Sequence, residues 1–379
     1  RAGGMIEVGR TLGLSPFAAF RRLSLPLARP AIAGGVALAL METLADYGTV
    51  SYFAVQTFTT GIYRAWFSLG DRAAAAQLAM ALLLFVVGVL LLERLTRGGS
   101  RFHDSTLRSQ GVVRVPLQGL RAALAILGCA VPLLGGFLLP AGVMLRMALR
   151  EGDVQFGARF LTLAGNSITV AGLTALLAVV LALLIAYAAR VDKGATMRWA
   201  HRVSGLGYAL PGSVIAVGVL IPVTWLDHAL AALLRRSLGV EAGLLLTGTI
   251  AALVYACVVR YLTAALQAVD AGLARITPSM EQAARTLGHT PAQTLWRVHL
   301  PLLRGSALTA ALLVFIDVMK ELPATLVMRP FNFDTLATQA YTLASDERLA
   351  EASTSALAIV VVGLAPLVVL CRNIVRAEH

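Results

Sequence analysis

Carboxylates inside an apolar helical segment are the residues of this sequence best suited to chemistry. Asp317 and Glu321 lie four residues apart in a predicted helix over 305–327, with Lys320 between them. Residues at i and i+4 share one helix face. Charge at membrane depth costs at least ~2.5–3.5 kcal/mol per group, so it is rarely accidental. Carboxylate oxygens suit a hard, highly charged cation.

A second carboxylate pair, Glu42 and Asp46, occurs at the same spacing in a predicted helix over 31–50. We therefore expect four carboxylates and Lys320 to flank a translocation path that opens outward. The alternative is structural, because Asp317 and Lys320 form an i, i+3 pair and the carboxylates would then lock local donors or a gate. The sequence indicates no catalytic residue and no firm metal ligand.

The composition indicates that membrane helices position these charges. Hydrophobic residues make up 58% of the chain, charged residues only 14%, and the mean hydropathy is +0.77. Soluble domains are about 45–50% apolar and about 25% charged. Eight segments reach the length needed to cross a bilayer. They are residues 31–50, 73–92, 122–145, 160–189, 203–226, 242–259, 305–327 and 352–371.

The basic residues predict the orientation of these spans. Lys and Arg concentrate in residues 1–30, 93–121, 190–202 and 260–304, which alternate spans place on one side of the membrane. The positive-inside rule makes that side cytoplasmic. Orientation therefore accounts for the net charge of +12, and the sequence predicts a lipid bilayer and no nucleic acid as partner.

An internal repeat predicts the domain organisation. MIEVGRTLGLSPFAAFRRLSLPLAR (5–29) matches MEQAARTLGHTPAQTLWRVHLPLLR (280–304) at an offset of 275 residues. Both copies precede a charged span on the same side, which indicates two parallel-related halves. We expect the C-terminal part of a first half with two spans (1–92), a basic cytoplasmic linker (93–120) and a complete second half with six spans (121–379). The first half is then truncated, and the chain is expected to be a fragment.

Each repeat copy is predicted to form a helix–turn–helix on the cytoplasmic face. In the second copy, a helix over 280–287 is expected to end at Gly288, which tolerates a left-handed cap. Pro291 is expected to open a second helix over 292–299, which stops at Pro301. Two such loops in front of charged spans indicate docking surfaces, whereas one alone would more simply be a structural loop.

These loops resemble the EAA loop of ABC-transporter permeases, the binding-protein-dependent inner-membrane components. The resemblance implies ATPase-coupling roles for Gln282, Ala283 and Ala284 at the Glu-Ala-Ala positions, Glu281 one residue early, and Gly288, Leu300 and Pro301. In the first copy it implies them for Glu7, Gly13, Leu25 and Pro26, whereas Val8 and Gly9 replace the alanines. METLADYGTVSYFAVQTFTTGIYRAWFSLGD (41–71) and DVMKELPATLVMRPFNFDTLATQAYTLASDERL (317–349) further resemble fused two-half ferric-iron permeases.

The resemblance implies an all-α, multi-pass transport subunit in the bacterial inner membrane. A cytoplasmic ABC ATPase homodimer would carry the ATP, and a periplasmic or surface substrate-binding protein would deliver the cargo. No G-x-x-x-x-G-K-[ST] phosphate loop occurs in the sequence, so we expect no bound cofactor and no enzymatic activity of the chain itself. Thiamine, polyamine, sulfate or phosphonate are alternative cargoes. An ATP-independent channel or secondary transporter is the alternative class.

The predicted outer segment 328–351 is aromatic and charged. Arg329, Phe331, Phe333 and Tyr341 lie in it. Aromatic residues are common anchors at the membrane interface. A surface that receives the loaded binding protein is the second interpretation, and both stay open.

Overall fold

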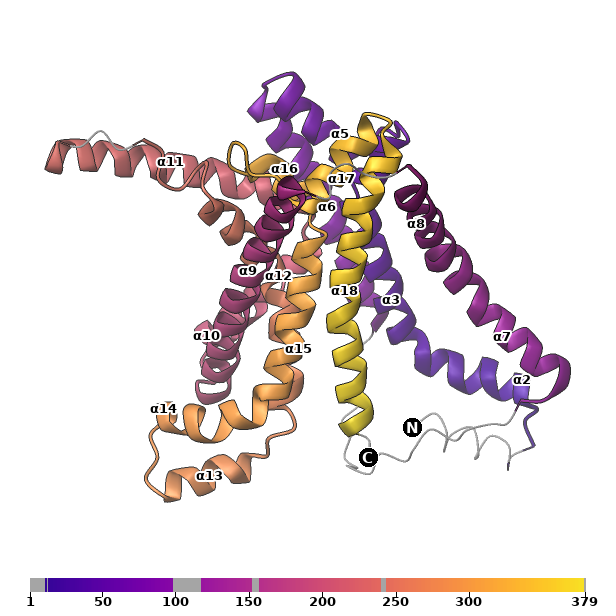
Figure 1. The fold of residues 1–379 in the computed structure, drawn as a ribbon. Helices are drawn as coiled ribbons and strands as arrows, with labels where there is room; N and C mark the ends of the chain where they lie inside the picture. Colours follow the sequence, from indigo (N-terminus) through magenta and orange to yellow (C-terminus); the bar gives the residue numbers. More distant parts are fainter. Residues whose placement is uncertain (1–10, 12, 98–116, 152–156, 240–242, 378–379) are drawn as a thin grey trace. The chain divides into compact units, whose positions relative to one another are not determined.

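The computed structural model describes residues 11, 13–97, 117–151, 157–239 and 243–377, and every regular element in them is a helix (Figure 1). Six of these helices are long and apolar enough to cross a membrane. A seventh span results if the pair Phe17–Arg29 and Ala31–Ala45, bent by 54°, counts as one. The eighth predicted span, 352–371, lies in α18 (Leu349–Ala377). The all-α membrane class is confirmed.

The chain forms two compact units. The first unit combines residues 1–44 and 84–142. It contains α2 (Pro16–Ala19), the π-helical η1 (Phe20–Ser24), most of α3 (Leu25–Ala45), the second part of α6 (Arg72–Arg97), α7 (Gly119–Leu133) and η3 (Leu134–Leu138). The predicted linker falls mostly on residues 98–116, outside the described residues. The division into 1–92, 93–120 and 121–379 stays a prediction.

The second unit combines residues 45–83 and 143–379 and holds most of the described chain. Its first elements are α4 (Gly48–Tyr52), α5 (Phe58–Tyr63), η2 (Arg64–Ser68), the end of α8 (Leu139–Glu151), α9 (Ala158–Val191), α10 (Ala195–Ser204) and η4 (Gly207–Ala209). The remaining elements are α11 (Gly212–Leu238), α12 (Ile250–Leu273), α13 (Pro278–Thr286), α14 (Pro291–Thr294), η5 (Leu295–His299), α15 (Leu300–Met319), α16 (Pro323–Met328), α17 (Leu336–Ser345) and α18.

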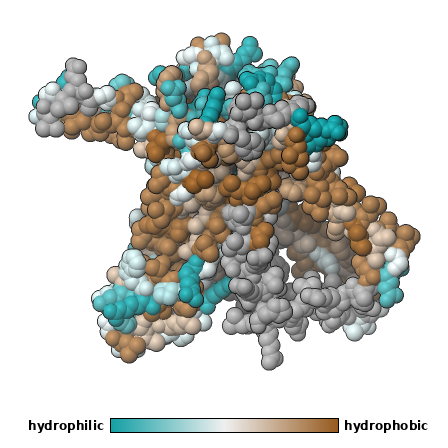
Figure 2. Space-filling view, in the orientation of Figure 1, coloured by the Kyte–Doolittle hydropathy of each residue, from teal (hydrophilic) through white to brown (hydrophobic). Residues whose placement is uncertain are grey.

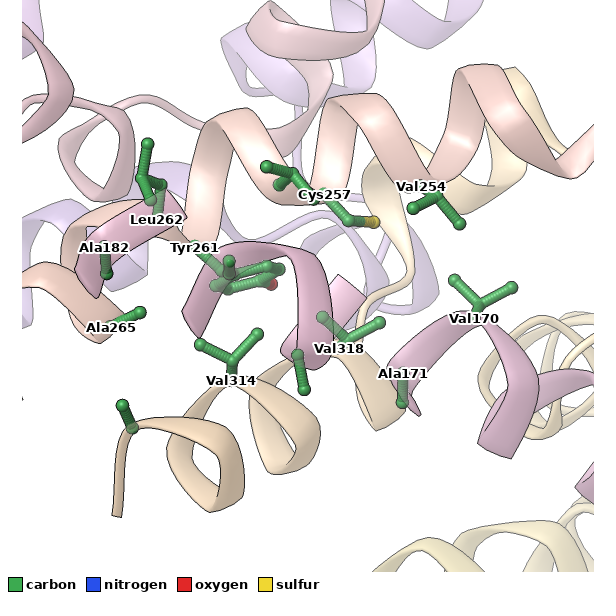
Figure 3. Close-up of a cluster of buried hydrophobic side chains, with 14 of the residues drawn as sticks. Val170, Ala171, Ala182, Val254, Cys257, Tyr261, Leu262, Ala265, Val314 and Val318 are labelled. Carbon is green, nitrogen blue, oxygen red and sulfur yellow. The ribbon is translucent and has the colours of Figure 1, made fainter. Parts of the chain in front are cut away.

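The core of the second unit lies between α9, α12 and α15 (Figure 3). Helix α9 contributes a buried stripe of small residues, namely Ala171, Ala175, Ala178, Ala182 and Ala186. Lipid tails are as apolar as side chains, so membrane helices associate through close packing, and small residues allow their backbones to approach. Tyr261 and Cys257 of α12 and Val314 of α15 fill the space between the helices.

Two predicted spans are wrong in position. The predicted spans 203–226 and 242–259 correspond to α11 and α12, which begin and end roughly ten residues later. The charge-free run 242–259 predicts that the later span ends before Arg260. Arg260 instead lies buried inside α12 and pairs with Glu321, and buried Asp227 of α11 accepts backbone N–H bonds from Leu245, Leu246 and Thr247. Arg260 therefore lies within the span and not in the predicted cytoplasmic segment 260–304.

Candidate functional site

The second repeat copy forms the predicted helix–turn–helix. Helix α13 ends before Gly288, whose φ of +79° is the left-handed conformation expected of a capping glycine. Pro291 opens α14, and Thr290 and Gln293 cap it reciprocally. Three local features therefore determine the loop conformation, namely the glycine cap, the proline at the helix start and the capping box.

The predicted stop at Pro301 is wrong, because α14, η5 and α15 form one continuous helix into the membrane span. Proline lacks an N–H, and its ring crowds the carbonyl four residues earlier, here that of Arg297. The preceding turn is π-helical instead, and the Leu300 N–H donates to the Leu295 carbonyl. A π-turn widens the helix by one residue, which accommodates the proline without a break.

The described part of the first copy, in the first unit, repeats three backbone features of the second copy. Gly13 has a φ of +82°, α2 opens at Pro16, and η1 is a π-helical turn in front of Leu25 and Pro26. Each feature lies 275 residues before its counterpart. Glu7 lies outside the described residues. The repeat is therefore structural as well as sequential.

The loop of the second copy exposes apolar and basic side chains together. Leu287 and Trp296 are exposed large hydrophobic residues, and Arg285 and Arg297 are exposed beside them. Figure 2 shows hydrophilic surface around α13 and α14 beneath the apolar surface of the second unit's helices. Gln282 and Ala283 are also exposed, whereas Ala284 is buried. Such a mixed surface suits the docking of another protein.

The second carboxylate of each pair caps a short helix. Glu321 Oε1 accepts the Ala324 N–H at 3.0 Å at the start of α16, and Asp46 Oδ1 accepts the Thr49 N–H at 3.3 Å at the start of α4. Carboxylates at this position satisfy N–H groups that have no partner within the helix. This equivalent role follows from the repeat and was not predicted.

Glu321 also belongs to a buried polar cluster in the second unit. Arg260 Nη1 lies 2.5 Å from Glu321 Oε2, and the Tyr261 hydroxyl donates to the same oxygen. All three residues are buried. A buried carboxylate in such a cluster is stabilised by its partners. Sequence analysis missed Arg260 and Tyr261, although a lone arginine within an apolar run was the available signal.

The remaining charges have different surroundings. Lys320 Nζ lies 3.1 Å from Asp317 Oδ1, with 56% of the Lys320 side chain exposed and 17% of that of Asp317. Glu42 is exposed on α3 in the first unit. Among the described residues, no three His, Cys, Asp or Glu side chains gather as metal ligands would. Contact of these carboxylates with cargo stays a prediction.

Three tyrosines join two segments of the second unit that are far apart in the sequence. The Tyr341 hydroxyl lies 3.0 Å from both the Tyr47 hydroxyl and Ser51 Oγ. The Tyr47 and Tyr63 rings stack with centroids 3.9 Å apart, and the Tyr63 hydroxyl donates to the Pro323 carbonyl. We call Tyr47, Tyr63 and Tyr341 the tyrosine junction.

A sequence signal for the tyrosine junction was present and overlooked. The pattern Thr-x-x-Thr-x-x-Tyr occurs at 57–63 and again at 335–341. Each copy begins with a reciprocal capping box, so α5 and α17 start alike. Of the predicted outer aromatics, Tyr341 therefore belongs to the junction. Phe331 is 94% exposed, and Arg329 pairs with Asp334.

The duplicated loops and apolar helices define a class of membrane transport subunits. The chain belongs to the family of binding-protein-dependent transport system inner membrane components, whose model matches residues 3–98 and 178–377. It is a multi-pass protein of the inner membrane.

Two curated relatives are named as ferric-iron permeases. The chain is 28% identical over 367 residues to the Fe(3+)-transport system permease protein FbpB 2 of Haemophilus influenzae, covering 93% of this chain and 68% of that protein. It is 24% identical over 359 residues to the ferric transport system permease protein FbpB of Actinobacillus pleuropneumoniae, covering 89% of this chain and 49% of that protein. The chain thus spans only part of the length of each.

Two further comparisons are shorter or more distant. The putative 2-aminoethylphosphonate transport system permease protein PhnV of Salmonella typhimurium is 27% identical over 198 residues, covering 52% of this chain and 69% of that protein. A chain of a bacterial alginate ABC transporter, crystallised with its pentasaccharide-bound periplasmic protein, matches with a TM-score of 0.50 and 18% identity. It covers 66% of this chain and 92% of that one, and supports the fold alone.

Proposed function

We propose that this chain is the permease of an ATP-driven, binding-protein-dependent importer of ferric iron. The observation that carries the proposal is the pair of loops that share the geometry of the glycine, the proline and the π-turn, each in front of an apolar helix. The helix after the second loop is one span, and the helix after the first is bent by 54°. Two equal docking loops fit a dimeric ATPase, because a two-fold partner needs two equivalent contacts. The loops then transmit the ATPase movement directly into the helices.

The proposed partners divide between the two membrane faces. A cytoplasmic ATPase homodimer holds and hydrolyses ATP, and the loop residues Gly13, Leu25 and Pro26 and Gly288, Leu300 and Pro301 receive it. A periplasmic or surface binding protein delivers the cargo at the outer segment, where exposed Phe331 offers an apolar contact. The chain itself supplies the path and no catalysis.

Ferric iron is supported as cargo by the names of the two relatives that match most of this chain. Glu42, Asp46, Asp317, Lys320 and Glu321 are the proposed residues of the path. In the conformation described here, Glu321 is engaged by Arg260, so a role for it in the path requires that pair to open. Asp317 and Glu42 are more accessible to a passing cation.

The test is uptake by the complete transporter in proteoliposomes, with its ATPase and with iron-loaded binding protein outside. We expect ferric-ion uptake that requires ATP and ceases when the ATPase carries a catalytically inactive site. Uptake that continues with the inactive ATPase would instead indicate a channel or secondary transporter.

A phosphonate is the second candidate cargo, because a relative named for 2-aminoethylphosphonate transport matches half of the chain. The same proteoliposomes distinguish the two cargoes. Uptake of labelled 2-aminoethylphosphonate with its own binding protein, together with no uptake of ferric ion, would replace iron as the cargo.

A further inference from the structure

The carboxylate of Glu281 lies where the loop of the second repeat copy (280–304) meets the membrane helices. Arg190, near the end of α9, donates from Nε to Glu281 on α13. Nε2 of His299, at the end of η5, lies 3.3 Å from the same carboxylate. His299 is fully buried, and Arg190 and Glu281 are largely buried. One carboxylate thus contacts groups from two other elements.

Arg190 extends the connection to α12. Its Nη1 donates to the Leu273 carbonyl at 2.5 Å, and its Nη2 donates to the Ile276 carbonyl. Leu273 ends α12, where backbone carbonyls have no partner within the helix and favour a cation. The planar guanidinium can donate in several directions at once, which an ammonium group cannot do in the same geometry.

Apolar packing contributes little to holding α13 against the membrane helices. Among the side chains of α13 that the structure describes, Ala284 alone is buried. Tyr187, also on α9, donates its hydroxyl to the Pro291 carbonyl at 2.7 Å, which ties the start of α14 to the same helix end. The Tyr187 and His299 rings lie 5.1 Å apart. The attachment of the loop is therefore largely polar and is concentrated on Arg190 and Glu281.

We propose that Arg190 and Glu281, supported by His299, are positioning residues that transmit movement of the docked ATPase from α13 to α9, α12 and α15. We call these three residues the Glu281 clamp. The inference rests on the proposed function, because it presupposes an ATPase on the loop. It goes beyond the family resemblance, which implies a coupling role for Glu281, because Arg190 lies on α9 outside the repeat copy and joins Glu281 to the membrane helices.

The first copy does not repeat two of the three clamp residues. The residues aligned with Glu281 and His299 are Ile6 and Ser24, which have no ionisable side chain. In the described residues, the two loops share the backbone geometry of the glycine, the proline and the π-turn. We expect the second loop to transmit movement more rigidly than the first.

The test measures ATP hydrolysis and cargo uptake in the same proteoliposomes and takes their ratio. In Arg190→Met and Glu281→Gln, we expect the ATPase to remain bound and active while uptake per ATP falls about five- to tenfold, as for loss of one coupling interaction. Arg190→Lys keeps the charge but loses the fork geometry, so we expect an intermediate ratio. If Arg190→Met fails to reach the membrane, Arg190→Lys and Glu281→Gln carry the test.

The matched control is the pair of His201 on α10 and Asp270 on α12, with Nε2 and Oδ2 3.0 Å apart. Asp270→Asn should leave uptake per ATP unchanged. An Arg190→Met ratio equal to that of Asp270→Asn would overturn the proposal. So would loss of ATPase binding in Arg190→Met, because the residues would then shape docking and not transmission. An unmutated transporter without ATP-dependent uptake would instead refute the proposed function.

Discussion

Gly212 shows how tightly the buried charge cluster constrains single residues. A Cβ atom at this position would lie 2.5 Å from Arg260 Nη1 and 2.6 Å from Glu321 Oε1. These distances are too short for any side chain, so the ion pair would have to separate. Glycine is required here by space and not by backbone conformation.

Gly212→Ala is therefore expected to lower the amount of folded protein in the membrane. Breaking a buried pair costs about 3–5 kcal/mol, because each charge loses its partner. Quantitative immunoblotting of membrane fractions measures the effect. Gly218→Ala in the same helix is the control, since no atom lies within 4 Å of its added Cβ. Equal abundance of the two variants would contradict the prediction.

Asp317 and Glu321 should respond differently to neutralisation. Glu321→Gln strands buried Arg260, so we expect low abundance that Arg260→Met in the same chain restores. Asp317→Asn leaves the Lys320 ammonium without this partner, but 56% of that side chain is exposed and water can solvate it, so abundance should hold.

Uptake then tests the path at Asp317. We expect Asp317→Asn at normal abundance to reduce ferric-ion uptake, because the proposed path loses a carboxylate. The double variant Asp317→Asn with Lys320→Met separates the alternatives. If the double variant transports normally, Asp317 serves only to pair with Lys320.

At the scale of elements, the π-helical turns determine how each loop is oriented on its helix. A π-turn inserts one residue, which rotates everything before it by about 100° relative to the helix after it. Pro26 and Pro301 favour that turn in the two copies, because neither can donate to the carbonyl four residues back.

We expect Pro301→Ala to let η5 relax to an α-helix and to misdirect the loop. Uptake should fall several-fold while membrane insertion is retained, since the apolar span is unchanged. Pro26→Ala tests the same device in the first copy. Trp296 is exposed, so a Trp296→Cys variant can be cross-linked to the ATPase, and a changed cross-linking pattern would report the rotation of the loop. Unchanged cross-linking together with unchanged uptake would contradict the prediction.

The tyrosine junction is a second structural feature at the scale of elements. It fastens the segments that follow α3 and α15 through hydroxyl groups and ring stacking. Tyr63→Phe removes the donor to the Pro323 carbonyl and keeps the ring. We expect ATP hydrolysis without cargo to increase about fivefold, because a net hydrogen bond contributes about 1 kcal/mol to the conformation described here. Tyr52→Phe, at an exposed tyrosine outside the junction, should change nothing.

At the scale of the whole molecule, sequence analysis predicted the class of fold and the docking loops because both depend on local signals. Apolar run length predicts spans, and Gly288 and Pro291 predict a cap and a helix start. The predicted helix ends before Arg260 and at Pro301 were wrong for the same reason. A charge or a proline breaks a helix only when nothing compensates it, and the ion pair and the π-turn compensate here.

The partners of charged groups lay beyond what local patterns can reveal. Arg190 finds Glu281 and two carbonyls only after α9, α12 and α13 converge. Tyr47, Tyr63 and Tyr341 meet across a long sequence separation, although their repeated Thr-x-x-Thr-x-x-Tyr pattern could have been found by extending the repeat search past the three-residue insertion.

The alanine stripe on α9 has a consequence for motion. Its members, from Ala171 to Ala186, lie three or four residues apart, close to the helical repeat. Such a face presents nearly the same shallow surface after a displacement of one turn along the helix axis. We therefore expect that α12 and α15 can shift along the stripe with little change in packing there, once the hydrogen bond from Arg190 to the end of α12 has opened.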